Sequence, residues 1–388
     1  MPELPEIEAT VRLLDAALAG ATVDAARAPG LATMRTFAPP LDALEGATLT
    51  GLGRRGKLLL VGFAGGGLPG ASPVGEAGTP DRPVPPDPDR PASPDDPANG
   101  GATVAGDPRV TSAVPVPPGS DAVLVLHLMS AGRLQLYDRR AGMRDRTTRL
   151  VVRVVGGGDA GDDGPERELR LREFGTKQAA WAKLLPVGEL AGDETLTTLG
   201  PEAWPAPPEL GATLPPRRTL RGALRDQRVI AGIGRSWADE ILWTARLAPL
   251  RRGGDLDEGE RARLRDAIVE VLDGTLRHYL GVRGAEVEDG PSAAADITAP
   301  GVDAPDPAAP DPGALGAGEP DGGVLALPLP DKLPLPLQVH RRAGRPCPRC
   351  GDPILAVHYE DDEMAYCATC QTDGKPYKDR RFSRLLKE

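Results

Sequence analysis

Residues 226–242 read DQRVIAGIGRSWADEIL and place a glycine turn between two helical stretches. Gly232 and Gly234 permit tight backbone conformations and let another chain or a phosphate approach closely. The helix after the turn begins at this point, where an anion is stabilised by the unpaired backbone N–H groups. Taken alone, two glycines at this spacing are a weak phosphate signal, and packing of neighbouring helices is the favoured interpretation of the pair. The stretch therefore predicts a helix–turn–helix unit and leaves its ligand open.

The hydrophobic pattern of the sequence differs between the N-terminal half and the region around this turn. Residues after about 190 are helical, whereas apolar runs and alternation typical of strands precede them. Runs of strands followed by runs of helices indicate separate domains. The expected helices are 5–18, 220–227, 236–247 and 259–276, and the expected strands are 58–63, 121–128, 132–137, 148–155 and 166–174.

Two segments account for much of the excess of glycine and proline. Residues 64–120 hold seven acidic and three basic residues, and residues 284–330 hold nine acidic residues with no lysine or arginine. Neither segment carries enough apolar side chains to offset the entropy lost on ordering, so both are expected to be disordered.

The acidic segments hide the charge of the remaining chain. The whole sequence has a net charge of −10, but without the two segments the net charge is +3. Basic residues cluster, for example at Arg54, Arg55 and Lys57, and such clusters suit phosphate contacts. An ordinary solvated surface in an arginine-rich sequence explains them equally well. Charge alone does not decide between these interpretations.

The compartment follows from two further features. The first twenty residues lack the basic start and apolar run of a signal peptide, and no apolar stretch is long enough to span a bilayer. All four cysteines lie in one C-terminal segment, which fits a metal site in a cytosolic protein better than a secreted disulfide framework. We expect a cytoplasmic, nucleoid-associated monomer without membrane contact.

The cysteines form two CxxC pairs separated by sixteen residues. This spacing is typical of a tetrahedral zinc site with a β-hairpin between the pairs. Redox pairs or two disulfides are the alternatives. We expect one structural Zn²⁺ ion, bound by Cys347, Cys350, Cys367 and Cys370.

The first six residues, MPELPE, admit two interpretations. Proline near the start of a helix, with acidic residues complementing the helix dipole, is a common structural feature. Glu3 and Glu6 are three residues apart and can share a helix face. The same acids beside an N-terminal proline could instead form the front of an active site.

The order of the motifs along the chain resembles the formamidopyrimidine-DNA glycosylase and endonuclease VIII family. The resemblance covers nearly the whole chain outside the two acidic segments. It rests on MPELPE, RRGK at 54–57, HLMSAGRL at 127–134, REFG at 172–175, LGPE at 199–202, the glycine turn and CPRCGDPI with YCATCQ.

The resemblance implies an α+β multidomain fold and a base-excision repair enzyme. The implied parts are an N-terminal β-sandwich with flanking helices (1–190), a helix-two-turn-helix domain (191–283) and a four-cysteine zinc-finger β-hairpin with a basic tail (331–388). Double-stranded damaged DNA would lie between the domains with the damaged base flipped out. Pro2, freed by removal of Met1, would attack the sugar and form a Schiff base, followed by β,δ-elimination.

Specific residues carry the implied chemistry. Glu3 would act as general acid and base, Glu6 would support proton handling and Lys57 would reach a phosphate near the lesion. An α-amino group titrates at about 7.7–8.0, so part of it is unprotonated at neutral pH. The candidate DNA contacts are Arg54, Arg55, Met129, Arg172, Phe174, Gly234 and Arg235.

The sequence departs from the family pattern at three positions. Ser130 occupies the place of the usual void-filling methionine, with Met129 one residue earlier, and Arg235 replaces the usual phosphate-binding asparagine. Asp362 stands where a DNA-contacting arginine is usual. Its carboxylate is expected to repel the DNA backbone, so the basic tail from Lys375 is an alternative contact. The alternative functions are a lyase acting mainly on abasic or single-stranded sites, and a catalytically weak protein that binds damaged DNA.

Overall fold

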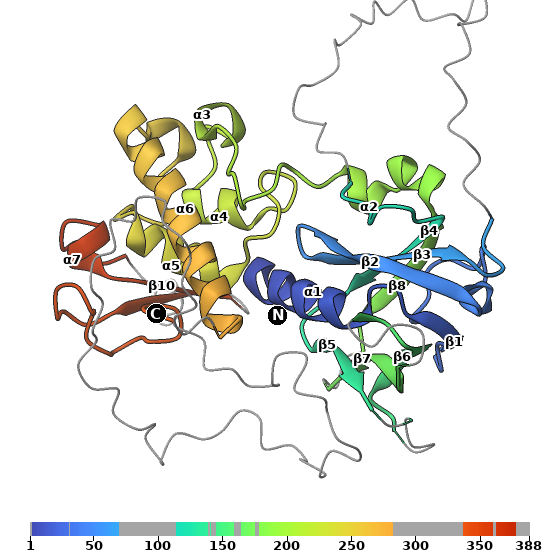
Figure 1. The fold of residues 1–388 in the computed structure, drawn as a ribbon. Coiled ribbons are helices and arrows are strands. Elements are labelled where there is room, and N and C mark those ends of the chain that lie inside the picture. The colour runs from blue at the N-terminus through green and yellow to red at the C-terminus, as the bar shows by residue number, and fades with distance from the viewer. Residues whose placement is uncertain are drawn as a thin grey trace, which may run out of the picture.

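The computed structural model describes residues 2–30, 32–69, 114–138, 140, 145–158, 164–174, 178–281, 337–359 and 362–377. Figure 1 shows a strand-rich part, a helical part beside it and a C-terminal hairpin packed on the helices. The predicted α+β fold with an N-terminal β-sandwich is confirmed.

Eight strands form the N-terminal sheet. Their spatial order is β5-β7-β6-β1-β2-β3-β4-β8, and every neighbouring pair is antiparallel. The strands are β1 (Thr22–Arg27), β2 (Ala47–Arg55), β3 (Leu58–Gly65), β4 (Ala122–His127), β5 (Gly132–Tyr137), β6 (Thr148–Val155), β7 (Glu166–Glu173) and β8 (Trp181–Pro186), with the 3-10 helix η1 (Leu41–Leu44) between β1 and β2.

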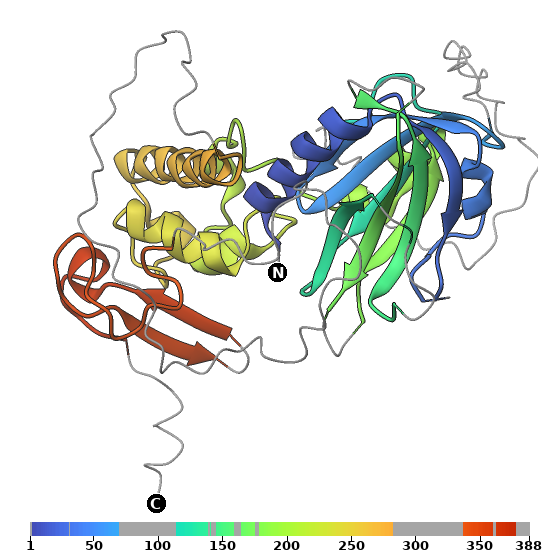
Figure 2. The ribbon, with the colours of Figure 1, turned by 60° about the horizontal axis from the view of Figure 1, so that its bottom comes forward.

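The sheet curls around one apolar core to which all eight strands contribute (Figure 2). In β6 alternate residues are buried, as the alternating sequence predicts for a strand with one face in the core. In β3 both faces are buried: Leu59 and Val61 face this core, and Leu58 and Leu60 face a second cluster. The second cluster is covered by η3 (Val187–Gly192) and α2 (Glu194–Thr197), which explains the unbroken apolar run of β3.

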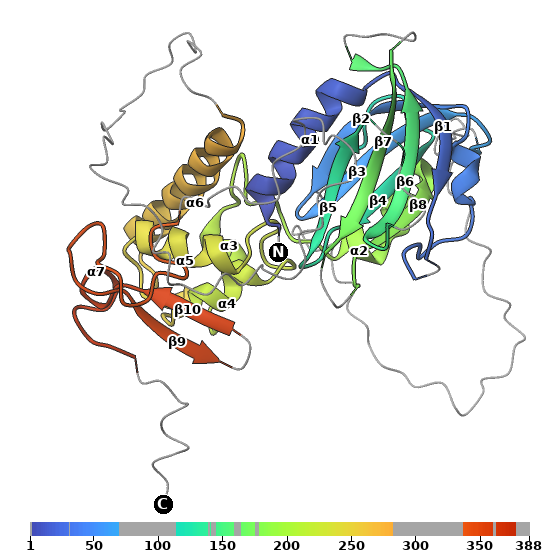
Figure 3. The same cartoon turned by 90° about the horizontal axis from the view of Figure 1, so that it is seen from below.

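Helix α1 (Leu4–Leu18) joins the two domains. Leu4 and Ala9 belong to the core of the helical part, whereas Val11 and Leu14 belong to the core of the sandwich. One helix therefore buries its apolar side chains in two cores. This arrangement fixes the first residues of the chain at the junction between the domains (Figure 3).

Apart from Leu4 and Ala9 of α1, the core of the helical part is formed by residues from Ala203 onward. It contains α3 (Leu210–Thr213), α4 (Leu220–Arg225), α5 (Arg235–Thr244), the 3-10 helix η4 (Gly253–Asp255) and α6 (Glu258–Tyr279). Gly232, at φ +107°, lies in the turn between α4 and α5. The C-terminal part has the predicted hairpin, β9 (Leu355–Tyr359) and β10 (Asp362–Tyr366), followed by α7 (Ala368–Gln371).

Some expectations fail in detail. The segment expected to be disordered, 64–120, is too wide, because β3 extends to Gly65, Leu68 is buried and Val114 and Val116 pack on the second cluster. Residues 70–113, 284–330 and the tail after Tyr377 lie outside the described residues. Strands β1, β2 and β8 were missed, because alanine, glycine and proline dilute their β-forming residues. Among the described helices, none is long and apolar enough to cross a bilayer.

Candidate active site and nucleic-acid interface

The N-terminal segment packs directly on the glycine turn. The backbone N–H of Leu4 donates to the carbonyl of Gly232 over 3.1 Å. A Cβ at residue 232 would lie 2.3 Å from Leu4 Cδ1, and one at residue 234 would lie 2.2 Å from the carboxyl carbon of Glu3. Both glycines are therefore needed for this close approach. This is the packing role that the sequence indicated as the favoured interpretation of Gly232 and Gly234.

Glu3 fills the N-terminus of α5. Its carboxylate accepts hydrogen bonds from the backbone N–H groups of Gly234 (2.6 Å), Ser236 (3.0 Å) and Trp237 (3.4 Å), and the residue is 2% exposed. The helix start, whose ligand the sequence left open, therefore holds a carboxylate of the protein itself. The contact pins the residue after Pro2 to the helical part.

Glu6 lies in the same buried space. It accepts hydrogen bonds from the Glu3 N–H (3.1 Å), Tyr279 Oη (3.0 Å) and Trp237 Nε1 (3.4 Å). Burial raises the pKa of Glu6, and the nearby Glu3 carboxylate raises this pKa further. Burial, with Glu6 close by, also raises the pKa of Tyr279 and keeps it a donor. Glu6 therefore holds a proton to higher pH than an ordinary glutamate.

Lys57 lies in the turn between β2 and β3 and is 7% exposed. Burial lowers its pKa, while the carboxylates of Glu3 and Glu6 oppose this shift. Lys57 lines a cavity of about 520 Å³ together with His127, Arg225, Gln227 and Arg228. Burial lowers the pKa of His127 to about 4, with Lys57 adding to the effect, so this imidazole is neutral at pH 7.

Arg54 and Arg55 were expected at the DNA, but the structure places both inside the protein. Arg54 pairs with Glu8 (2.6 Å) and Glu202, and Arg55 pairs with Glu202 (2.7 Å) and donates to the Gly200 carbonyl (2.7 Å). They are 8% and 3% exposed. Their guanidinium groups hold residues 199–202 against the sandwich, which argues against a DNA contact.

The remaining strand-side candidates lie together at one end of β5 and β7. The Phe174 N–H donates to the Ala131 carbonyl over 3.4 Å, and Phe174 is 48% exposed. Arg172 stacks on Phe174 at 4.8 Å and donates to Tyr137 Oη over 2.8 Å. Met129 has a left-handed backbone, at φ 49°, and packs partly buried on the second cluster.

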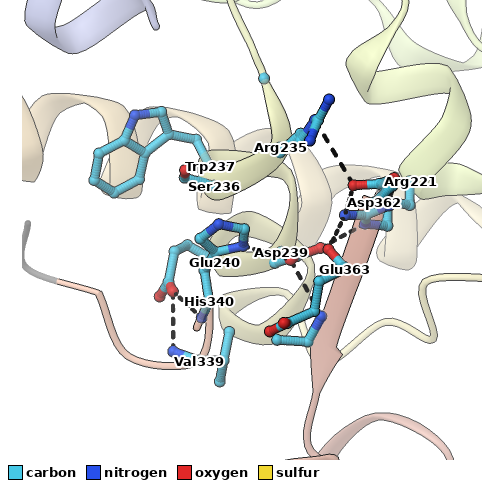
Figure 4. Close-up of polar contacts among 12 residues, drawn as sticks. Arg221, Arg235, Ser236, Trp237, Asp239, Glu240, Val339, His340, Asp362 and Glu363 are labelled. Carbon is cyan, nitrogen blue, oxygen red and sulfur yellow. Dashed lines mark hydrogen bonds and ion pairs between the residues drawn. The ribbon is translucent and has the colours of Figure 1, made fainter. Parts of the chain in front are cut away.

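Arg235 and Asp362 form part of one ionic cluster (Figure 4). Arg235 Nε lies 3.8 Å from Asp362 Oδ1, and Asp362 also pairs with Arg221 (2.7 Å) and Arg225. Burial alone would raise the pKa of Asp362, but the pairs with Arg221 and Arg225 outweigh it and hold the pKa below its usual value. The Asp362 carboxylate is thus paired with arginines of the protein, and its expected repulsion of the DNA backbone stays a prediction.

Two buried acids of α5 anchor the C-terminal part, and sequence reasoning missed them. Asp239 accepts from Arg221 (2.6 Å) and contacts His340 Nδ1 (2.8 Å). Glu240 accepts from the backbone N–H groups of Gln338, Val339 and His340, at 2.8 to 2.9 Å (Figure 4). Adjacent acids inside the apolar sequence SWADEIL are the signal that could have revealed them.

The four cysteine sulfurs lie within 4.8 Å of one another. Cys347 and Cys370 Sγ are 3.9 Å apart and Cys350 and Cys367 Sγ are 3.5 Å apart, too far for disulfide bonds. Trp243 Nε1 donates to Cys347 Sγ over 3.4 Å, which favours a thiolate there. The donor set can hold one metal ion in tetrahedral geometry.

Comparison with known proteins follows the same division of the chain. Residues 1–79 match the sequence model of the formamidopyrimidine-DNA glycosylase N-terminal domain, and residues 211–283 match that of the formamidopyrimidine-DNA glycosylase H2TH domain. An uncharacterized formamidopyrimidine-DNA glycosylase-like protein of Mycobacterium tuberculosis is 33% identical over 200 residues, which is 51% of this chain and 100% of that protein. The chain belongs to the formamidopyrimidine-DNA glycosylase / endonuclease VIII family.

Other members of this family match more of the chain. The formamidopyrimidine-DNA glycosylase of Moorella thermoacetica is 28% identical over 373 residues, covering 92% of this chain and 94% of that protein. Among solved structures, Lactococcus lactis Fpg bound to abasic-site DNA and MutM bound to carbocyclic 8-oxo-G DNA each superpose with a TM-score of 0.60 at 18% identity. Each covers 96% of this chain and 100% of its own, and the likeness extends the fold assignment to both domains and the finger.

Proposed function

We propose that this formamidopyrimidine-DNA glycosylase family member is a bifunctional DNA glycosylase and AP lyase, with Pro2 as nucleophile. The observation that supports this proposal is the anchoring of Glu3, the residue after Pro2, on α5, with Glu6 and Lys57 close to Glu3. The proposed ligand, double-stranded damaged DNA, lies between domains 1–190 and 191–283.

In the proposed first half-reaction the Pro2 amine, freed by loss of Met1, attacks C1′ of the damaged nucleotide. The C1′–base bond breaks as the leaving base takes a proton from Glu3, which has first accepted the proton lost by the Pro2 amine. The C1′–O4′ bond then breaks, O4′ takes up a proton, and the nitrogen lone pair forms the iminium between Pro2 and C1′. Glu6, whose pKa is raised by burial, holds a proton that it can supply to O4′.

In the second half-reaction a proton is removed from C2′ of the iminium. The C3′–O bond breaks by β-elimination, the C5′–O bond then breaks by δ-elimination, and water releases Pro2. Burial lowers the pKa of Lys57, and the carboxylates of Glu3 and Glu6 partly offset this shift. In the proposed complex Lys57 lies near the bond that breaks. It holds the phosphate that leaves with the cut strand.

The C-terminal part, residues 331–388, is proposed to be a zinc finger. Cys347, Cys350, Cys367 and Cys370 would hold one structural Zn²⁺ that fixes the hairpin and supplies no chemistry to the reaction. The proposed enzyme acts as a monomer at the bacterial chromosome.

Borohydride trapping tests this function. The protein is incubated with an abasic duplex and borohydride, and the adduct is located by tandem mass spectrometry. We expect one adduct on Pro2. The matched control carries two extra residues before Pro2, which removes the free proline amine, and it should form none. An adduct on a lysine, or an adduct in the extended control, contradicts the proposal.

One observation favours a second candidate, a lyase acting mainly on abasic or single-stranded sites. Ser130 is exposed at the tip where a long side chain would fill the space left by a flipped base, while Met129 packs back onto the protein. Comparing cleavage of oxidised-base duplexes with abasic duplexes decides between the two. For Ser130→Met we expect faster cleavage of duplexes with a paired oxidised base and unchanged cleavage of abasic duplexes. An unchanged ratio contradicts this candidate.

A further inference from the structure

Asp362 is the centre of an arginine cluster built from three elements. It is the first residue of β10, Arg221 and Arg225 come from α4, and Arg235 begins α5. All three arginines form ion pairs with this carboxylate, and Arg235 does so at the longest distance, 3.8 Å. Figure 4 shows Arg221 and Arg235 beside Asp362. A residue of the hairpin thus organises cations that belong to the helical part.

The three arginines differ in what they can offer a ligand. Arg221 is 6% exposed and is held from two sides, by Asp362 and by the fully buried Asp239. The side chains of Arg225 and Arg235 are 29% and 54% exposed. Arg221 therefore ties Asp362 to the buried network, while Arg225 and Arg235 form the outward side of the cluster.

The outward side adjoins the proposed catalytic residues. Arg225 lines the same cavity as Lys57 and His127. Arg225 and Arg235 also lie close enough to Lys57 to lower its pKa, beyond the larger effect of its burial. Under the proposed function, a DNA strand whose damaged nucleotide reaches Pro2 would pass these two guanidinium groups.

We propose that Asp362 is a positioning residue that holds Arg225 and Arg235 as a two-arginine clamp for one backbone phosphate beside the lesion. Forked guanidinium donors bind a phosphate with two parallel hydrogen bonds when their planes are fixed. The Asp362 carboxylate screens the repulsion between the two cations and restricts the long, exposed Arg235 side chain. This inference rests on the proposed function, which makes DNA the ligand.

For the DNA affinity of Asp362→Asn, the clamp and the net charge of the protein predict opposite changes. Asp362→Asn adds one positive charge to the protein near the DNA, so unspecific electrostatics predicts tighter binding. The clamp predicts weaker binding, because the arginines lose the group that aligns them. Glu363→Gln is the matched control: it changes charge equally, one residue away, and the Glu363 carboxylate pairs with His358 (3.4 Å) on the hairpin.

The test uses the zinc-loaded full chain and a duplex with a stable abasic analogue, titrated by fluorescence anisotropy from low to moderate salt. We expect Asp362→Asn to bind about tenfold more weakly and Glu363→Gln to bind within about twofold of wild type. Arg235→Ala should lower the salt slope by about one. In a double-mutant cycle, Asp362→Asn should weaken DNA binding less in the Arg235→Ala background than in the wild-type background. Equal or tighter binding by Asp362→Asn overturns the clamp.

A second variant decides the matter if Asp362→Asn loses the fold of the finger. Arg235→Lys keeps the charge and the surface position but loses the fork, and we expect binding about fivefold weaker. Wild-type affinity in Arg235→Lys overturns the clamp. Failure of the proposed function looks different: the wild type itself would then give no borohydride adduct. An active wild type with unaffected variants refutes the clamp alone.

Discussion

Replacing Gly234 by alanine tests how the N-terminal residues are held. The Cβ would lie 2.2 Å from the carboxyl carbon of Glu3 and 2.4 Å from its Oε1. Contacts this short cannot exist, so either the Glu3 carboxylate leaves the N-terminus of α5 or the helix moves. The backbone at Gly234 has φ −121°, which alanine adopts freely. The effect is therefore steric and acts on Glu3.

The magnitude follows from the bonds lost. Two of the backbone N–H groups, those of Gly234 and Ser236, donate to the carboxylate at 2.6 and 3.0 Å. Hydrogen bonds to a charged group contribute about 1.5 kcal/mol or more each, so the free energy of unfolding should fall by about 3 kcal/mol. Because Glu3 follows Pro2, we also expect the rate of Schiff-base trapping to fall at least about tenfold.

Urea unfolding and borohydride trapping measure the two effects. Gly274→Ala is the matched control, because it lies within α6 and no atom lies within 4 Å of its added Cβ. Alanine there should raise stability by roughly 0.5–1 kcal/mol and leave trapping unchanged. If Gly234→Ala unfolds like the wild type and forms adduct at the same rate, the Glu3 anchor neither stabilises the fold nor positions the nucleophile.

Three further predictions concern other parts of the molecule. Burial raises the pKa of Glu6 in the folded state, so the contribution of its proton to stability is complete below pH 4.5 and is lost as pH rises through the folded-state pKa. Over this pH window the free energy of unfolding of Glu6→Gln should therefore rise relative to that of the wild type. Urea unfolding of both proteins at several pH values measures this difference, and a difference that stays constant with pH contradicts the prediction. A strong chelator should remove one zinc ion per chain, measured by elemental analysis, and change the fluorescence of Trp243, which donates to Cys347 Sγ; an apoprotein with unchanged fluorescence argues against a metal-ordered finger. Arg54→Ala should lower the free energy of unfolding by about 3 kcal/mol and leave the salt slope of DNA binding unaltered, whereas a reduced slope would restore Arg54 as a phosphate contact.

Sequence patterns predicted most elements of the fold. Apolar periodicity located α1, five of the strands and the three main helices, because each buries a continuous face whose spacing is visible in the sequence. The CxxC spacing predicted the cysteine cluster, since two short knuckles bring four sulfurs together by local geometry. Strands β1, β2 and β8 carry weak local signals and are strands because their neighbours in the sheet pair with them.

Charged residues mark the boundary between what sequence and structure decide. A sequence gives the charge of Arg54, Arg235 and Asp362 but not their neighbours. Tertiary packing turned Arg54 inward to Glu8 and Glu202, and it gave Asp362 three arginine neighbours from α4 and α5. Electrostatic energy depends on distance and burial, and contacts between residues over one hundred positions apart leave no local pattern.

The sequence alone determined the family, the order of the parts and the residue types available for chemistry at the N-terminus. Only the tertiary structure decided that the anion at the start of α5 is Glu3, because a carboxylate and three N–H groups more than 230 residues apart meet through the packing of α1 on the glycine turn. The glycines at 232 and 234 are readable as a turn in the sequence. What they accommodate, Leu4 and Glu3, is fixed by the folded chain.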